Sequence, residues 1–431
     1  MSEPGFQRVA LGEIAYLEMG QSPDSRYVLD DPFVGYPFLQ GNAEFGAVFP
    51  EPEFGCTKPA KLCKAGDVLI SVRAPVGAVN LADRDYCIGR GLAAIRAPNI
   101  KPSLMGELVA RQSSDLRRVA QGTTFEAINK KDLQSLVLNL PPNDDLPVVA
   151  QILDTLDTAI AQTQAIIAKL KAVKQGLLHD LLTRGIDANG ELRPPQSEAP
   201  QLYKPSELGW IPKEWDSKQL AGLLGDFDPA MRSGPFGSAL LKQELVEDGL
   251  PLLGIDNVHT ERFIADYTRF VTSRKFAQLV RYAVRPDDLM ITIMGTVGRC
   301  CLVPENIGQA LSSKHTWTIS INQDAYSPYL AMLQVNYSPW VLGHFARDQQ
   351  GGTMAAIRSE TLRSTRLPVP PREEQRLMEK VLRELSKRID SEADSLAKRQ
   401  LEKAGLMDDL LTGRVHVTPL LAGVRQEKEC A

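Results

Sequence analysis

An internal repeat constrains the fold of this 431-residue chain more than any other feature of its sequence. The segment QGTTFEAINKKDLQSLVLNLPP at 121–142 matches QGGTMAAIRSETLRSTRLPVPP at 350–371, an offset of 229 residues. The same offset relates GLLHDLLT at 176–183 to GLMDDLLT at 405–412. A repeat at a fixed offset indicates that one architecture occurs more than once. We therefore predict a tandem duplication.

The repeat includes segments that are typical of strands. GDVLISVRAPVG at 66–77 corresponds to DDLMITIMGTVG at 287–298, and YPFLQGN at 36–42 weakly resembles LPLLGIDN at 250–257. Apolar, β-branched runs that end in glycine-containing turns predict buried strands. A repeat of helices alone, as in a coiled-coil scaffold, would leave these runs unexplained. The predicted fold class is therefore α+β, with each half a mixed globular domain followed by a helix.

Two long helices are predicted, at 146–185 and 372–415, because apolar residues there recur in alternating steps of four and three. This period is typical of a coiled-coil seam. Helices of this length extend over roughly 50 Å. The second seam is polar in its middle, so we expect an antiparallel coiled coil that is held most firmly near its ends. The seam residues are Leu153, Leu156, Ile160, Ile167, Leu170, Leu382, Leu385, Ile389, Leu396 and Leu406.

The helices divide the rest of the chain. Residues 1–145 and 216–371 are the two predicted globular domains, and 416–431 form a C-terminal tail. Pro, Ser, Gly and Glu dominate 186–215, which predicts an exposed linker. Two tryptophans near its end, Trp210 and Trp215, are expected to pin it to the second domain.

Composition and charge exclude several classes of protein. No apolar run approaches the length of a membrane span, and the first residues lack the layout of a signal peptide. The six cysteines form no C-x-x-C pair, so we expect reduced thiols, no metal site and a cytoplasmic location. The formal net charge of −4 is not typical of a protein that binds DNA without partner subunits.

The sequence contains no catalytic or cofactor-binding motif that we can identify. The phosphate-binding motif G-x-x-x-x-G-K-[ST] and the nucleophile motif G-x-S-x-G do not occur. DPFV at 31–34 has one proline too few for the D-P-P-[FY] motif of amino-methyltransferases. We therefore expect no catalytic residues and no cofactor on this chain. Two alternatives stay open: a methyltransferase or nuclease with its own recognition domains, and a coiled-coil adaptor unconnected with DNA.

The order of the repeated blocks resembles a known family. RLPVPPREEQ at 366–375, followed by GLMDDLLTG at 405–413, is similar to a block that occurs twice in the specificity (S) subunits of type I restriction–modification systems. LGWIPKEW at 208–215 resembles the entry to the second recognition domain of that family, and CIGRGLAAIRA at 87–97 a block within its recognition domains. The first copy departs from the pattern, with NDDLP at 143–147 where the family favours a short run ending in Glu-Gln.

The resemblance implies a non-catalytic DNA reader. Each globular half would be a target-recognition domain for one half of a split, asymmetric DNA target, and the paired helices would fix the unread spacer. The helices would also dock two copies of a methyltransferase (M) subunit and, through them, a restriction (R) subunit. S-adenosylmethionine and ATP are expected on those partners, and the M subunits would supply much of the phosphate contact that this acidic chain lacks.

Base readout requires polar or cationic side chains on loops that face a groove of the duplex. The loops near the repeated strands carry such residues. In the first domain the candidates are Asn42, Arg73, Arg90, Thr123 and Thr124, and in the second they are Asn257, His259, Lys314, His315, Thr353 and Arg358.

Overall fold

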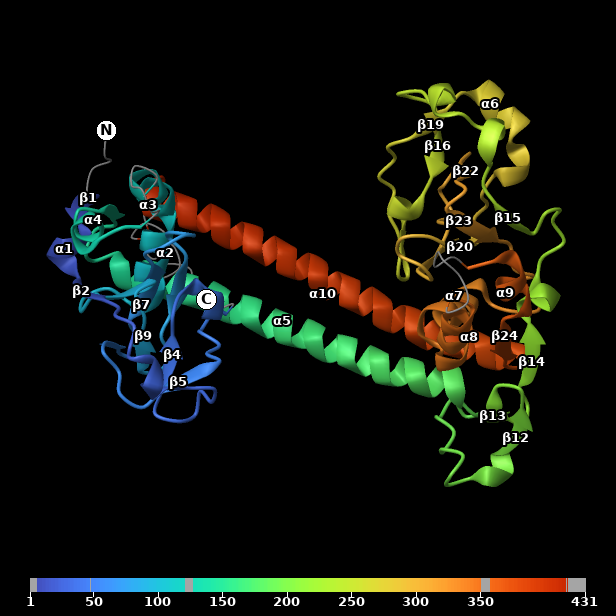
Figure 1. Ribbon diagram of the computed structural model, residues 1–431, viewed down its shortest axis with the longest axis horizontal. Coiled ribbons are helices and arrows are strands. Elements are labelled where there is room, and N and C mark those ends of the chain that lie inside the picture. The colour runs from blue at the N-terminus through green and yellow to red at the C-terminus, as the bar shows by residue number, and fades with distance from the viewer. Residues whose placement is uncertain (1–5, 47, 121–126, 350–356, 416, 418–431) are drawn as a thin grey trace, which may run out of the picture. The chain divides into compact units, whose positions relative to one another are not determined.

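The structure is a computed structural model that describes residues 6–46, 48–120, 127–349, 357–415 and 417 (Figure 1). It divides into two compact units. Unit 1 comprises 1–166 and 392–431, and unit 2 comprises 167–391. Each unit therefore contains one globular domain, the beginning of one long helix and the end of the other. This differs from the consecutive segments into which the sequence analysis divided the chain.

Unit 1 is built on two small sheets that share a core. The antiparallel sheet has the order β2-β10-β7-β8, and the mixed sheet has the order β3-β5-β4-β9-β6. In the antiparallel sheet the strands are β2 (Tyr16–Met19), β7 (Val68–Ser71), β8 (Val79–Leu81) and β10 (Leu92–Arg96). In the mixed sheet they are β3 (Val28–Leu29), β4 (Tyr36–Leu39), β5 (Phe54–Cys56), β6 (Leu62–Cys63) and β9 (Tyr86–Ile88). The helices are α1 (Leu11–Ile14), α2 (Pro102–Arg111), α3 (Ser113–Ala120) and α4 (Lys130–Gln134).

Unit 2 repeats this arrangement, but among the described residues its second sheet has three strands where that of unit 1 has five. Its antiparallel sheet has the order β15-β23-β20-β21, and its second sheet has the order β19-β16-β22. The strands are β15 (Met231–Ser233), β20 (Leu289–Thr292), β21 (Cys300–Leu302), β23 (Thr316–Ile319), β16 (Leu250–Leu253), β19 (Phe270–Val271) and β22 (Leu311–Ser312). A hairpin adds β17 (Val258–His259) and β18 (Arg262–Phe263), and the helices are α6 (Ser273–Gln278), α7 (Pro328–Tyr337), α8 (Pro339–Gln349) and α9 (Ser359–Ser364). The sheet of β16 lies with α6, away from α7 and α8 (Figure 1).

The same local hydrogen bonds and the same order of strands occur within each unit. In unit 1 the Ser71 hydroxyl donates to Pro75 O over 2.7 Å and accepts from Ala78 N over 2.9 Å. In unit 2 the Thr292 hydroxyl makes the same two bonds, to Thr296 O and from Arg299 N. Both hydroxyls close the turn that follows the central buried strand of the sheet. A repeated local hydrogen-bond pattern of this kind shows why these blocks match in sequence.

The strand that directly precedes each long helix pairs with the strand that opens the same domain. β11 (Val137–Leu140) pairs antiparallel with β1 (Gln7–Ala10), and β24 (Arg366–Val369) pairs antiparallel with β14 (Asp216–Gln219). Each globular domain is thereby closed at the point where its helix begins.

The long helices are α5 (Leu146–Thr183) and α10 (Arg372–Thr412). In unit 1 the start of α5 and the end of α10 share one core, through Leu153, Leu410 and Leu411. In unit 2 the end of α5 and the start of α10 share another, through Leu181 and Leu382. Of the other predicted seam residues, Ile167 is buried, and Leu156, Ile160, Leu170, Leu385, Ile389 and Leu396 are half-buried.

One predicted seam residue is wrong. Leu406 is 38% exposed, whereas Met407 packs against the core of unit 1. The buried stripe takes a second consecutive step of four here, from Lys403 to Met407. A helix with 3.6 residues per turn drifts by about 20° per heptad from a strict seven-residue repeat, and an extra step of four restores the stripe. The same shift favours Leu178 in α5.

The segment predicted to be an exposed linker is an ordered part of unit 2. It forms a hairpin of β12 (Tyr203–Ser206) and β13 (Gly209–Pro212), and Trp215 is fully buried. The carboxylate of Glu374 accepts hydrogen bonds from Arg193, the Trp215 indole and the backbone N–H of Ile186. The expectation for Trp215 is therefore met, but Trp210 is half exposed and does not pin the segment.

Candidate nucleic-acid interface

A chain of backbone hydrogen bonds gathers three of the predicted DNA-contacting residues of unit 1 at one end of its sheets. Gly91 N donates to Gln40 O, Val72 N donates to Gly91 O, and Ile128 N donates to Val72 O. These bonds join the turns that carry Asn42, Arg73 and Arg90, because each of those residues is next or nearly next to a bonded one. Segments far apart in the sequence thus present polar side chains from one edge.

The side chains at this edge are available to a ligand to different degrees. Arg90 is exposed, and its Nε donates to the Ser22 hydroxyl over 3.3 Å. Arg73 is exposed, and its backbone bridges to Ala127. Asn42 is half-buried and begins a 3₁₀ turn. Ser22, which positions Arg90, was not identified from the sequence, since a single serine outside the repeated blocks gives no signal. Thr123 and Thr124 lie outside the described residues.

Unit 2 builds the same edge from a different sequence. Ser313 N donates to Leu253 O and Ile293 N donates to His315 O, as Gly89 N donates to Leu39 O and Val72 N to Gly91 O in unit 1. The turn Ser313–His315 therefore corresponds to the turn Gly89–Gly91. Lys314, which is exposed, occupies the position of Arg90.

A pocket of about 460 Å³ opens beside Lys314. Lys314, His315, Arg269 and Lys242 contribute to its lining. Partial burial lowers the pKa of His315, and the adjacent charges of Lys314 and Arg269 lower it further. Arg269 and Lys242 were not predicted from the sequence, because neither lies in a repeated block. They were recognised only because they line the same pocket as Lys314 and His315.

The assignment of Asn257 to base readout is corrected by its environment. Asn257 is 1% exposed, and its amide donates to Ile264 O and Asp266 O while its Oδ1 accepts from Gly254 N. Glu44 accepts the equivalent bond from Gly41 N in unit 1. Asn257 is therefore the cap of a buried turn, and it does not match Asn42 as the short sequence similarity suggested. All of its hydrogen-bonding groups are used within the fold.

The other predicted residues of unit 2 lie apart from the Lys314 turn. His259 is exposed in the β17–β18 hairpin, whose Glu261 bonds Lys174 of α5 over 2.6 Å and the hydroxyl of Tyr337. Arg358 is exposed at the N-cap of α9, next to Ile357, whose carbonyl accepts from the Trp317 indole over 3.2 Å. Trp317 on β23 thus ties the Arg358 segment to the sheet. Thr353 lies outside the described residues.

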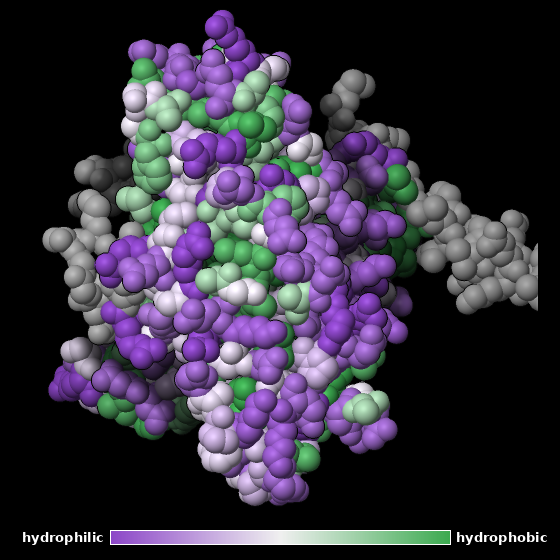
Figure 2. Space-filling model, turned by 90° about the vertical axis from the view of Figure 1, so that its right-hand side faces the viewer, coloured by the Kyte–Doolittle hydropathy of each residue, from purple (hydrophilic) through white to green (hydrophobic). Residues whose placement is uncertain are grey.

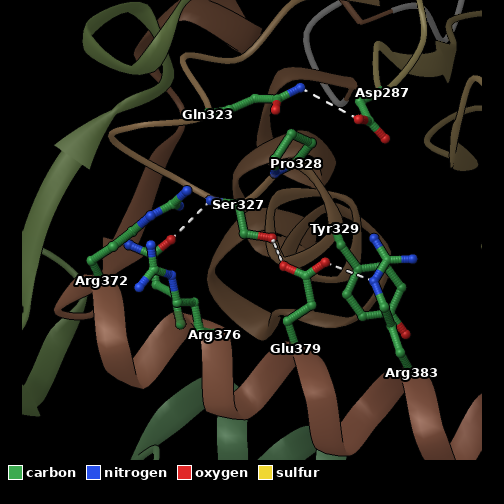
Figure 3. Close-up of a pocket in the computed structure, with 10 residues that line it drawn as sticks. Asp287, Gln323, Ser327, Pro328, Tyr329, Arg372, Arg376, Glu379 and Arg383 are labelled. Carbon is green, nitrogen blue, oxygen red and sulfur yellow. Dashed lines mark hydrogen bonds and ion pairs between the residues drawn. The ribbon is translucent and has the colours of Figure 1, made fainter.

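A second polar pocket, at the start of α10, serves the packing of helices (Figure 3). Glu379 accepts from the Ser327 hydroxyl and from Arg383, each over 2.6 Å, and the Arg383 guanidinium lies 4.0 Å from the centre of the Tyr329 ring. Gln375 accepts from Ser327 N over 2.8 Å. These contacts fix the first turn of α7 on α10. They explain the Glu-Glu-Gln block, of which Glu374 and Gln375 are buried.

His, Cys, Asp and Glu are side chains that commonly hold metal ions, and the described residues include all four types. Among them, no three His, Cys, Asp or Glu residues come together as a possible metal site. Burial raises the pKa of the thiols of Cys63, Cys87 and Cys301 to about 12, so these thiols are poor nucleophiles at neutral pH.

Among the described helices, none combines the length and the apolar composition that a membrane span requires. Figure 2 shows one face of unit 2, where hydrophilic side chains predominate and hydrophobic ones are dispersed.

Comparisons with known proteins give consistent results. The family model "Type I restriction modification DNA specificity domain" matches residues 4–172. A putative type I restriction enzyme MjaX specificity subunit from Methanocaldococcus jannaschii is 37% identical over 182 residues, which cover 41% of this chain and 43% of that protein. The MjaVIII specificity subunit of the same organism is 24% identical over 324 residues, 72% of this chain and 69% of that protein. The match thus spans less than half the length of the first relative.

Solved structures resemble the whole chain. The S subunit of a type I restriction–modification system from M. genitalium has a TM-score of 0.59 at 15% identity, with 94% of this chain and 96% of that one covered. A chain from a structure on complex assembly and conformational transition of the type I R-M system has a TM-score of 0.54 at 15% identity, covering 96% and 100%. Likeness at this identity shows the fold, and it confirms the α+β class with long helices.

Proposed function

We propose that this chain belongs to the type I restriction–modification DNA specificity family, whose domain model matches residues 4–172, and that it selects the DNA sequence on which a multisubunit assembly acts. In this proposal the two units are target-recognition domains produced by a tandem duplication. Each reads one half of a split target, and the chain itself catalyses no reaction.

The observation that carries the proposal is that each unit builds an equivalent edge from its own strands and turns. A basic residue, Arg90 or Lys314, stands at the centre of the same turn in both, on the same framework of backbone bonds. The neighbouring turn differs, with Arg73 in unit 1 and an exposed Met294 at the equivalent position of unit 2. Because the framework is kept and the presented side chains change, the two half-sites should differ in sequence.

The proposal assigns the chemistry to partners. Two M subunits would carry S-adenosylmethionine, extrude the adenine and methylate it at N6, and an R subunit would supply ATP-dependent cleavage. Together, α5 and α10 would form an antiparallel coiled coil that sets the unread spacer and docks the M subunits. Each unit supports this, since each holds the start of one helix beside the end of the other. The net charge of −4 supports a need for partners in phosphate contact.

The test is to express the chain with a type I methyltransferase (M) subunit from the same source and to map N6-methyladenine across the host genome. We expect one new split motif that is absent when either protein is expressed alone. A chain with Arg73→Ala and Arg90→Ala tests whether this edge of unit 1 selects its half of that motif. Methylation at no defined motif, in the presence of folded chain and active methyltransferase, would refute the proposal.

A further inference from the structure

The pocket beside Lys314 in unit 2 has the composition of an anion site. Lys242, Arg269, Lys314 and His315 line it, and the described lining residues include no Asp or Glu. The remaining walls are mostly apolar and include Leu240 and Leu252. Charges that face a low-dielectric wall interact more strongly with a ligand than charges in open water.

Arg269 is held in place before any ligand arrives. Its guanidinium pairs with Asp256 and lies against Gly254. A Cβ at position 254 would come within 2.2 Å of the Arg269 terminal nitrogen, so glycine is required for this path of the arginine. A guanidinium that is already oriented loses little conformational freedom when it binds a phosphate.

Polar atoms at the pocket also lack partners. Ser313 is 6% exposed and lines the pocket, and its hydroxyl has no hydrogen-bond partner, nor does the buried Nε of Arg269. Buried polar groups are normally satisfied, so unsatisfied donors beside a cationic pocket indicate a ligand with acceptor oxygens. Burial is the main cause of the lowered pKa of His315, and the nearby charges of Lys314 and Arg269 lower it further.

We propose that this pocket holds one backbone phosphate of the DNA and so anchors unit 2 on the duplex without reading a base. The proposal rests on the proposed function and extends it, because it assigns the class of contact. Phosphate contacts fix the register of a protein on DNA, whereas base contacts select the sequence.

The anchor belongs to unit 2. Arg269 is bonded through its carbonyl to Leu252 N on β16. The equivalent strand pair in unit 1 places Phe54 opposite Phe38 on β4. An aromatic side chain, partly buried against its own core, therefore takes the place of the arginine. The two units should consequently depend on salt to different extents.

The experiment measures DNA binding by the complex of this chain with its methyltransferase as a function of salt. Lys314→Gln and Lys242→Gln each remove one charge from the pocket, and Lys213→Gln removes an exposed charge of unit 2 outside it. The probes are the duplex that carries the mapped motif and a scrambled duplex of equal length. Thermal unfolding of each variant controls for folding, and Lys314→Arg tests rescue by charge.

We expect the two pocket variants to weaken binding to both duplexes alike, by roughly fivefold at 0.15 M salt, and to lower the slope of log K against log salt by about 0.9. Lys213→Gln should change neither quantity, and the methylated motif should stay the same. Relaxed specificity at one base pair with an unchanged slope would assign the pocket to base readout and overturn the proposal. So would variants that bind like the wild type.

The two proposals fail in different ways. A wild-type complex that does not distinguish the two duplexes refutes the proposed function. A wild-type complex that distinguishes them while the pocket variants keep its salt slope refutes the phosphate anchor alone. A separate readout needs no target: inorganic phosphate should raise the pKa of His315 in the isolated full chain, and an unchanged pKa at saturating phosphate would also refute the anchor.

Discussion

Lys314 in unit 2 stands where Arg90 stands in unit 1, at the centre of the turn between the parallel strand of the second sheet and the inner strand of the antiparallel sheet. The backbone of each turn is tied to the same two neighbours, Leu39 and Val72 in unit 1 and Leu253 and Ile293 in unit 2. The surrounding letters, IGRGL and SSKHT, share no residue at matching positions. The sheets therefore define this position in both units, and mutations there should affect DNA binding.

Arg73→Ala should weaken methylation of the target by about 1–3 kcal/mol if the guanidinium reads a guanine, because a bidentate contact to one base is lost. The loss should be confined to one position of one half-site. Arg84→Ala removes an arginine that is exposed on the same unit and pairs with Asp83, and it should leave methylation unchanged. The measurement is the rate of methylation on duplexes with each base pair substituted in turn. Equal rates for Arg73→Ala and the wild type would remove Arg73 from the interface.

Shortening both long helices should shorten the spacer that the assembly accepts. Deleting residues 161–167 and the repeat-related 390–396 removes one heptad from each, about 10 Å of helix, and keeps the seam in register. We expect the accepted spacer to shrink by about three base pairs, since base pairs are stacked 3.4 Å apart. Genome-wide methylation mapping gives the spacer directly. Deletion from one helix alone should abolish methylation. An unchanged spacer after both deletions would contradict the proposal that the two helices set the spacer length.

Glu374→Ala should destabilise unit 2 by about 3–5 kcal/mol, because it removes the buried carboxylate that pairs most closely with the Arg193 guanidinium and leaves only the more distant, exposed Glu214 as an ion-pair partner. The side chains of Arg193 and Glu374 are only 10% and 7% exposed. Glu373→Ala is the matched control, since Glu373 is 79% exposed and pairs with Arg376 at the surface. That change should cost less than about 1 kcal/mol. Equilibrium urea unfolding of the two variants distinguishes these effects. Equal unfolding midpoints would contradict a stabilising role for the buried Arg193–Glu374 ion pair.

Leu410→Ala should cost about 2–5 kcal/mol, whereas Leu406→Ala should cost well under half of that. Leu410 is 2% exposed and belongs to the core of unit 1, and Leu406 is 38% exposed. A strict heptad predicts that both lie in the seam. Thermal unfolding of the two variants therefore tests whether the buried stripe takes its second step of four. A larger loss for Leu406→Ala would restore the strict heptad.

His315 should titrate below the ordinary histidine pKa, because partial burial and the charges of Lys314 and Arg269 disfavour the imidazolium. The folded state then holds fewer protons than the unfolded state as the pH falls through the ordinary value of about 6.5. The contribution of His315 is present above that pH and is lost as the pH falls towards the folded pKa. Lys314→Gln should raise the pKa of His315 in an NMR titration. A pKa that Lys314→Gln leaves unchanged would show that the charge of Lys314 does not contribute to the shift.

Local patterns in the sequence determined the architecture. Two long helices and the buried strands around Val68 and Leu289 follow from periodicity, because a helix or strand must turn its apolar residues towards a core whatever that core contains. The repeat at an offset of 229 indicated two similar domains, and the order of the blocks indicated their family.

Only the tertiary structure decided which polar residues are free to bind. Asn257 and Lys314 both looked like loop residues, yet long-range contacts bury the first and expose the second. Arg269 lines the same pocket as Lys314 because strand pairing brings them together across 45 positions of sequence, and periodicity does not encode such proximity. A pattern specifies which way a side chain faces within its own element, whereas burial and hydrogen-bond partners depend on what the rest of the chain places against it.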